Sequence, residues 1–223
     1  RGRLDREARS RRTAKGAVSL EDFMASTGEG KRQLKLLIKA DQGGPAEALA
    51  DALQQLSNEE VQVEVVARAV ADPAAVLAGL GEPTRAGVQR IHRSPTLTIL
   101  NLVWGPMMTL MPHNHRMWAV IGIYTGREDN IFWRRIEGDP HGRVEAAGAH
   151  ALSVGDCVPL GRDIVHSVTN PIPRLTAALH VYGGDFFADG RSEWDAETLR
   201  EKPYDVEKNM RLFEESNARV AAG

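Results

Sequence analysis

Between residues 96 and 182 the chain reads as a series of short strands with no helix between them. Strands that follow one another in this way form antiparallel sandwiches or closed barrels. The segment 117–124 is apolar on both faces, which predicts that one face lines a barrel and the other packs against a second sheet. The predicted fold is therefore mostly β. The expected strands, separated by Gly, Pro or Asp, lie within residues 96–104, 117–124, 130–136, 144–160, 164–170 and 175–182.

Helical patterns flank this region. Residues 71–80 read as a helix that is broken at Gly81 and Pro83, and residues 206–220 read as an amphipathic helix. Ahead of them, residues 33–41 and 61–66 alternate like strands around a helical stretch at 46–56, a unit too small to close a core by itself. We therefore predict two parts: residues 1–66, a basic helical arm with a partial α/β segment, and residues 67–223, a β-barrel domain.

Charge and cysteine content narrow the function. A net charge of −2 argues against an overall nucleic-acid or membrane binder and favours a small-molecule partner. Residues 1–16 carry a local charge of +5, from seven basic and two acidic side chains, which we interpret as a solvated arm without function. A single cysteine, Cys157, excludes an internal disulfide and is expected to be a small buried hydrophobe. The single cysteine and the lack of an apolar run of membrane length lead us to expect a cytoplasmic protein. We expect it to be a monomer or a homodimer.

Three histidines are candidate ligands for a metal ion. His113 and His115 lie two apart on an expected strand, so their side chains project from one face and can meet one ion. His166 follows 51 residues after His115 on another strand, and a barrel can bring it opposite the pair. The three predict a divalent metal site, and imidazole ligands suit several metals, including Fe, Zn, Mn and Ni.

The spacing of these histidines resembles the two motifs of the cupin superfamily. Ala119 or Val120 stands where the acidic ligand of the first motif is expected. The resemblance implies a double-stranded β-helix, or jelly-roll, barrel over residues 67–223 with flanking helices, and a metal held by three histidines alone. The matching positions are Gly105, His113, His115 and Gly126 in the first motif and Pro159, Gly161, His166 and Asn170 in the second.

The run HSVTNPIPRLTAALHVYGGDF, together with GREDN, resembles the cysteine dioxygenases, whose metal is supported by a Ser-x-His-x-Tyr relay. His180 and Tyr182 occupy the His and Tyr positions, and Ala178 replaces the Ser. This resemblance implies an Fe(II) thiol dioxygenase that oxidises a small, cysteine-like thiol with O2 to its sulfinate. Tyr182 would donate a hydrogen bond to oxygen or sulfur at the metal, and His180 would orient Tyr182.

The same resemblance implies an arginine that binds a substrate carboxylate. Arg93 is the first candidate, followed by Arg90 and then Arg116, while Trp118 and Trp104 are expected to wall the pocket. Two alternatives remain open. One is a cupin isomerase or hydrolase using Zn, Mn or Ni as a Lewis acid, and the other is a cupin that binds small molecules through its metal without turnover.

Residues 1–66 carry a separate resemblance, to bacterial translation initiation factor 2. The similar runs are VSLEDF, LKLLIKAD and ALADALQQLSNEEVQVEVV. No counterpart of that factor's GTP-binding or initiator-tRNA domain is recognisable in the sequence, so we expect no translation activity. Association with ribosomes or RNA through residues 1–66 stays as a further alternative.

Overall fold

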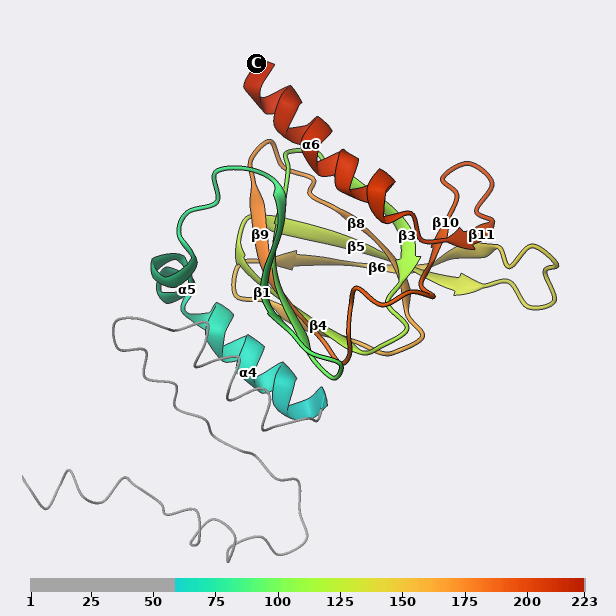
Figure 1. Ribbon diagram of the computed structural model, residues 1–223, viewed down its shortest axis with the longest axis horizontal. Coiled ribbons are helices and arrows are strands. Elements are labelled where there is room, and N and C mark those ends of the chain that lie inside the picture. Colours follow the sequence, from blue (N-terminus) through green and yellow to red (C-terminus); the bar gives the residue numbers. More distant parts are fainter. Residues whose placement is uncertain (1–58, 223) are drawn as a thin grey trace, which may run out of the picture. The chain divides into compact units, whose positions relative to one another are not determined.

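The structure, a computed structural model, describes residues 59–222 (Figure 1). Their strands form two antiparallel sheets that face each other. The five-stranded sheet has the order β1 (Gly87–Arg93), β2 (Thr98–Trp104), β9 (Thr176–Tyr182), β4 (Ala119–Thr125) and β7 (Cys157–Leu160). The six-stranded sheet has the order β11 (Glu201–Pro203), β10 (Ser192–Trp194), β3 (Thr109–Asn114), β8 (Val165–Thr169), β5 (Arg127–Arg135) and β6 (Val144–Ser153).

The connections among β2 to β9 give a jelly roll. The chain crosses from one sheet to the other at every step except the β5–β6 hairpin, so the two sheets contain the orders β2-β9-β4-β7 and β3-β8-β5-β6. Eight strands arranged in this way close a double-sheet jelly roll. The predicted fold class, a mostly β double-stranded β-helix with flanking helices, is therefore confirmed.

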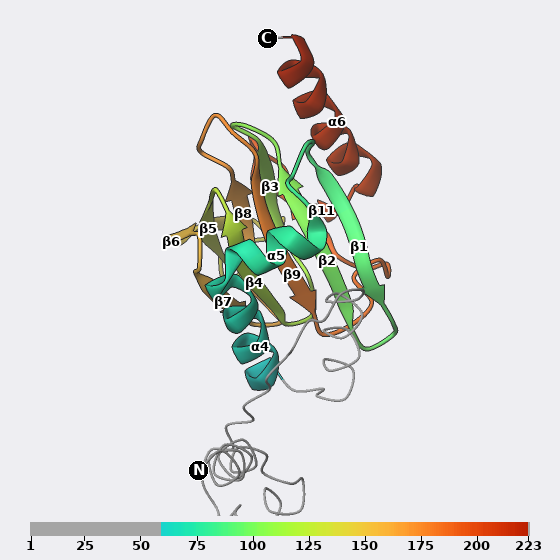
Figure 2. The same cartoon turned by 90° about the vertical axis from the view of Figure 1, so that its left-hand side faces the viewer.

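The strands of the five-stranded sheet are buried on both faces. On β2, Leu100 and Leu102 point into the barrel, while Ile99 and Val103 belong to a second cluster outside it. The expectation that this outer face packs against a second sheet is wrong. It is covered instead by two helices, α4 (Glu59–Ala71) and α5 (Pro73–Leu80), which cross it in Figure 2.

Helix α4 replaces the strand predicted at residues 61–66. The alternating valines suggested a period of two, but the apolar pattern continues as Val66 and Val70, which lie one helical turn apart and pack over Gly122 of β4. An ion pair with a distance of 2.8 Å between Glu64 and Arg68 also requires the helical i, i+4 spacing. The helix runs through the predicted boundary between residues 66 and 67.

The other two helices confirm their predictions. In α5, the Asp72 side chain accepts a hydrogen bond from the amide of Ala75, and Gly81 ends the helix with a positive φ of 83°. Helix α6 (Val206–Ala222) buries Phe213 against the indole of Trp104, with ring centroids 5.5 Å apart. Strands β1, β10 and β11 were not expected. The elements predicted at 33–41 and 46–56 lie outside the described residues.

Candidate metal centre

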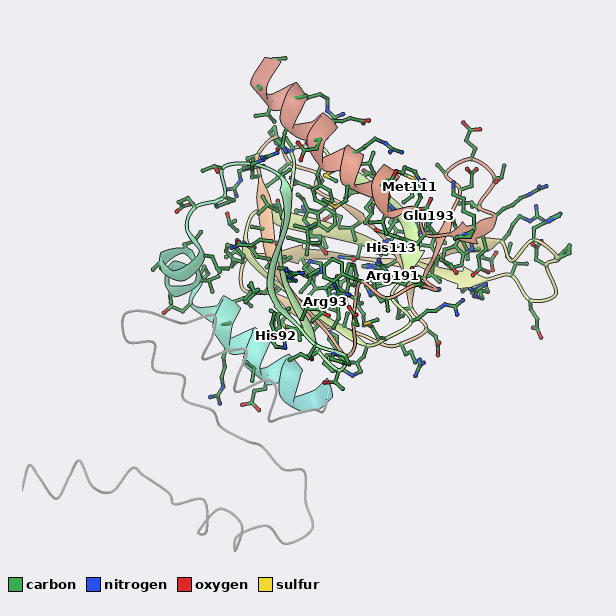
Figure 3. The ribbon with its side chains drawn as sticks, in the orientation of Figure 1. His92, Arg93, Met111, His113, Arg191 and Glu193 are labelled. Atoms are coloured by element: carbon green, nitrogen blue, oxygen red, sulfur yellow. The ribbon has the colours of Figure 1, made fainter. Side chains whose placement is uncertain are left out.

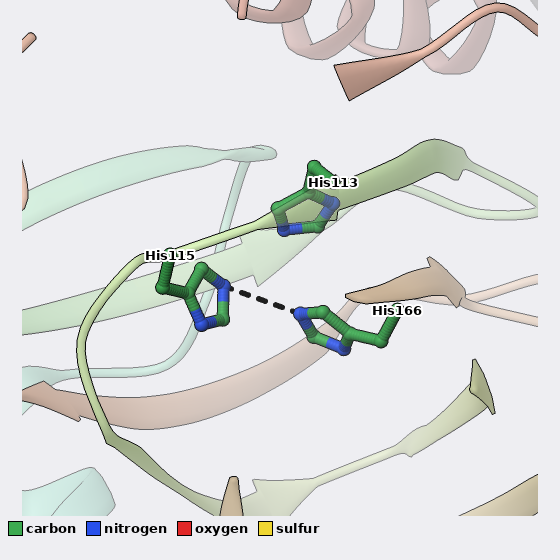
Figure 4. Close-up of side chains that lie close together, drawn as sticks. All are labelled: His113, His115 and His166. Atoms are coloured by element: carbon green, nitrogen blue, oxygen red, sulfur yellow. Dashed lines mark hydrogen bonds between the residues drawn. The ribbon is translucent and has the colours of Figure 1, made fainter. Parts of the chain in front are cut away.

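His113, His115 and His166 converge inside the barrel, as Figure 4 shows. Their nearest candidate ligand atoms all lie within 4.8 Å of one another, and Nε2 of His115 is 3.2 Å from Nε2 of His166. All three side chains are buried. Within residues 59–222 this is the one group of three or more His, Cys, Asp or Glu side chains arranged so that they could hold a metal ion.

Strand register explains how distant residues meet. His113 on β3 is the cross-strand partner of His166 on β8, so antiparallel pairing closes the separation along the chain. His115 lies just beyond the end of β3. The next residue, Arg116, has a positive φ of 56°, where the chain turns toward β4. The pair is thus held by one strand and the turn that follows it.

Hydrogen bonds orient two of the rings. Nδ1 of His113 lies 2.9 Å from the carbonyl oxygen of Met111, and Nδ1 of His166 lies 2.7 Å from Oδ1 of Asn130. Because both partners are acceptors, each Nδ1 carries the hydrogen and each Nε2 keeps a free lone pair. Partners of this kind are typical of metal-binding histidines, whose second nitrogen is fixed by an outer group.

The electrostatics favour neutral imidazoles. Burial lowers the pKa of His113 to about 4. Burial, followed by the neighbouring histidines, lowers the pKa values of His115 and His166 well below the ordinary value. Neutral rings with free lone pairs are the form that binds a metal.

The spacing also fits one ion. Two nitrogens bound at 2.0–2.1 Å in octahedral or tetrahedral geometry are separated by roughly 2.8–3.4 Å, and the two Nε2 atoms of His115 and His166 are 3.2 Å apart. In the part of the chain that the structure describes, no carboxylate joins this ligand group. The donor set therefore fits a divalent metal held by three neutral histidines, with further coordination positions left for a ligand.

His180 and Tyr182 lie next to this centre. The Tyr182 ring stands edge-on to the ring of His115, with centroids 5.0 Å apart, and its hydroxyl is 3.0 Å from Nδ1 of His180. Burial raises the pKa of Tyr182 above its ordinary value. The catalytic roles predicted for both residues stay predictions, but they contact each other and border the metal centre. Ala178, in place of the relay serine, lies in the apolar core.

A buried polar network behind the histidines was not predicted. Glu128 on β5 accepts a hydrogen bond of 2.7 Å from Nε1 of Trp104 and one of 3.0 Å from Nδ2 of Asn130. Its Oε2 also lies 3.7 Å from Nε2 of His180. Glu128 and Asn130 both belong to the GREDN motif. Their alternate positions on a strand are the signal that could have placed their side chains inside the barrel.

The cavity at the centre has a volume of about 70 Å³. A cavity needs about 10–15 Å³ to hold one water molecule, so the space suits a ligand of only a few heavy atoms. Trp104 lines it as expected, whereas Trp118 lies in the outer cluster that packs beneath the helices. The other lining residues next to the metal centre include Phe186, Phe187, Arg191 and Tyr204.

The arginines proposed from sequence do not line this cavity. Arg93 is on β1, where its Nε and Nη2 each donate a hydrogen bond of 2.8 Å to Asp185, and Arg90 is exposed on the same strand. Arg116 lines a larger outer cleft of about 820 Å³. The substrate-binding roles of these residues and of Trp118 stay predictions, without a contact to the metal centre in this structure.

Arg191, which the sequence did not single out, does line the cavity. Figure 3 labels it beside His113, while Arg93 is labelled on β1. Its guanidinium lies between two rings, 4.1 Å from the centroid of Phe186 and 4.3 Å from that of Tyr204. The side chain is buried, its Nη1 has no hydrogen-bond partner, and no carboxylate among residues 59–222 forms an ion pair with it. It also belongs to the wall of the outer cleft.

Comparison with protein families gives a match at the N-terminal end. The model for translation initiation factor 2 matches residues 9–75. The factor from Symbiobacterium thermophilum is 41% identical over 61 residues, and the one from Aliarcobacter butzleri is 45% identical over 65. These matches cover 27% and 28% of this chain but only 6% and 7% of those factors. The predicted resemblance of residues 1–66 is confirmed; most of that segment lies outside the described residues.

Solved structures similar to the chain include double-stranded β-helix proteins. A cupin family protein from Methanocaldococcus jannaschii has a TM-score of 0.39 at 11% identity and covers 47% of this chain and 85% of its own. Oxalate decarboxylase from Bacillus subtilis has a TM-score of 0.36 at 17% identity and covers 45% and 24%. Similarity at this level does not bear on function. Within residues 59–222, no helix has the length and apolar character needed to cross a membrane.

Proposed function

We propose that the barrel is a mononuclear non-haem iron dioxygenase that oxidises a small anionic thiol to its sulfinate. The observation that carries the proposal is the group of three buried, neutral histidines without a carboxylate among the ligands. Three neutral ligands leave both charges of a divalent metal uncompensated, which favours an anionic ligand such as a thiolate. Bound Fe(II) would supply the activation of O2.

The overall reaction is R–SH + O2 → R–SO2H. Two S–O bonds form and the O–O bond breaks, so sulfur loses four electrons and O2 gains four, and no external reductant is needed. The small cavity leaves little room for water beside a bound thiol, and Tyr182 with His180 provides a polar group next to the candidate metal site. These features support the role of both residues beside the substrate.

Arg191 supports an anionic substrate. Guanidinium groups stay protonated in proteins, and a buried charge without a counter-ion costs free energy. A carboxylate in the cavity would satisfy Nη1 and neutralise that charge, since arginine binds carboxylates through paired hydrogen bonds. We therefore assign Arg191, in place of Arg93, as the residue that binds the substrate carboxylate.

Oxygen uptake by the iron-loaded protein tests this proposal. We expect uptake with cysteine and 3-mercaptopropionate, with one sulfinate formed for each O2 consumed, and much weaker uptake with cysteamine, which lacks the carboxylate. Binding of iron without uptake for any thiol would contradict the dioxygenase. It would leave the isomerase or hydrolase and the non-catalytic ligand-binding protein as the surviving alternatives.

A further inference from the structure

Glu128 is a carboxylate inside the barrel without a lysine or arginine partner among the described residues. It is fully buried on β5 and receives its two hydrogen bonds from neutral donors, Trp104 and Asn130. An ionised carboxylate in such surroundings costs several kcal/mol unless other groups compensate it. The nearest group that can do so is His180, on the opposite sheet, at 3.7 Å.

The direction of the hydrogen bonds can be followed from the metal ligand to Glu128. When His166 binds a metal through Nε2, its Nδ1 carries a hydrogen and donates to Oδ1 of Asn130. The Asn130 amide is then oriented with Nδ2 toward Oε1 of Glu128, and the Trp104 indole can only donate to Oε2. Both carboxylate oxygens of Glu128 therefore act as acceptors.

The same reasoning orients His180. Its Nε2 is buried with no hydrogen-bond partner, and it faces Oε2 of Glu128. The separation of 3.7 Å exceeds a hydrogen bond, but a shift of about 0.7 Å would close it, and hydrogen bonds of catalytic groups are often long before substrate binds. A hydrogen on Nε2 leaves Nδ1 as an acceptor, so the Tyr182 hydroxyl must donate to it across 3.0 Å.

We propose that Glu128 is a positioning residue that fixes the tautomer of His180 and directs the Tyr182 hydrogen away from the cavity. The Tyr182 oxygen then faces the metal centre with its lone pairs and accepts a hydrogen bond from the substrate, for example from an ammonium group. This reverses the sequence expectation that Tyr182 donates toward the metal. The inference deepens the proposed function and rests on it for the metal on Nε2 of His166.

Nuclear magnetic resonance of the imidazole nitrogens in zinc-loaded protein tests the proposal without any turnover. Long-range proton–nitrogen spectra distinguish the two neutral tautomers of each histidine. We expect His180 to carry its hydrogen on Nε2 and to have Nδ1 unprotonated. A hydrogen on Nδ1 of His180 in the unaltered protein would overturn the proposal, and this outcome needs no variant.

The variant Glu128→Gln sharpens the test. A glutamine amide cannot accept from both Trp104 and Asn130, so its NH2 group must face one of these donors or turn toward His180. We expect His180 to shift toward the Nδ1-protonated tautomer. The matched control is Glu193→Gln, which neutralises the other buried glutamate, whose partners are Lys208 and Asn209. The control should leave the His180 tautomer unchanged; an equal shift in both variants would contradict the proposal.

Kinetics give a second readout if the protein oxidises thiols. With the metal ligands and Arg191 intact, Glu128→Gln should lower kcat by about 10- to 100-fold with little change in KM. An increase in KM at constant kcat would contradict a positioning role. Failure of the proposed function appears as an absence of oxygen uptake in the unaltered protein, whereas failure of this inference appears in the His180 tautomer, so the two can be separated.

Discussion

The two faces of β9 are equally buried but differ in what they bury. Ala177, Leu179 and Val181 face outward and belong to the apolar cluster beneath α4 and α5. His180 and Tyr182 face inward and belong to the polar groups around the metal centre. Burial of an apolar side chain stabilises the fold by about 1.5–3 kcal/mol, whereas burial of a polar group stabilises nothing unless it is paired. On β9, the outer face therefore contributes apolar packing, and the inner face carries the polar groups of the candidate site beside Ala178 of the barrel core.

The largest effect should come from removing one metal ligand on the inner face. We expect His166→Ala to reduce the bound metal from about one per chain to near zero and to lower activity by more than about 100-fold, because two imidazoles cannot replace three. Metal analysis checks the bound metal, and an oxygen electrode checks the activity. His150→Ala, at an exposed histidine of β6, is the control and should retain the metal. Full metal content in His166→Ala would contradict the site.

Arg191→Met should weaken substrate binding at the cavity without lowering the stability of the fold. A lost bond to a charged group weakens binding by about 10- to 100-fold, and this should appear as a higher KM for carboxylated thiols but not for cysteamine. Thermal unfolding should show a Tm that is unchanged or higher, because an unpaired buried charge has been removed. Arg93→Met, at the exposed pair with Asp185, is the control and should keep the substrate KM. A large fall in Tm of Arg191→Met would indicate a structural role.

Gly122→Val should disturb only the outer face. A Cβ at Gly122 would approach Cγ1 of Val66 to 2.5 Å and Cγ1 of Val70 to 2.8 Å, so α4 would have to move. Overpacking of this kind costs about 1–3 kcal/mol, measured as the free energy of unfolding in urea. Gly148→Val, on β6 where a Cβ meets nothing within 4 Å, should cost much less. Loss of bound metal in folded Gly122→Val would break the separation of the two faces.

The smallest effect concerns a surface ion pair outside both faces. Nη2 of Arg135 donates to Oε1 of Glu201 at 2.8 Å, and this hydrogen bond lowers the pKa of Glu201 to about 2. Because the folded-state pKa lies below the unfolded value, the stabilisation is complete above about pH 4.5 and is lost as the pH falls toward 2. Glu201→Gln should therefore lower the free energy of unfolding by about 0.5–1 kcal/mol at pH 7 and by less at pH 3. A difference that does not depend on pH would exclude this ion pair as its source.

Local pattern predicted most of the strands and the histidine cluster. The alternation of apolar residues marks a strand wherever one face meets the core, and two histidines at i, i+2 of a strand share a face. His115 lies one residue past the end of β3, so the expected strand holds only His113, but the two rings still lie close together. The same rule failed at residues 61–66, because the valine alternation was too short to be distinguished from the helical pattern that continues to Val70. Strands β10 and β11 were missed because each has only three residues, and β10 joins the sheet by pairing with β3, which is distant in the chain, while β11 pairs with β10.

The rest of the site depends on positions that no local pattern gives. Arg191 lies in a loop after β9 and reaches the cavity because the chain folds back to β10, which pairs with β3 at His113. Glu128 and His180 come from opposite sheets, so their approach follows from the closure of the barrel. The sequence predicted the three candidate histidine ligands. The groups that orient the side chains of the site could be identified only from the three-dimensional arrangement.

The most direct test of the central claim is X-ray absorption at the metal edge of iron-loaded protein. If one ion is held by His113, His115 and His166, the spectrum should show three imidazole ligands at about 2.0–2.2 Å and no sulfur ligand before a thiol is added. Addition of 3-mercaptopropionate should then introduce one sulfur ligand. Fewer than three imidazoles, or a sulfur ligand from Cys157 in the absence of added thiol, would contradict the account.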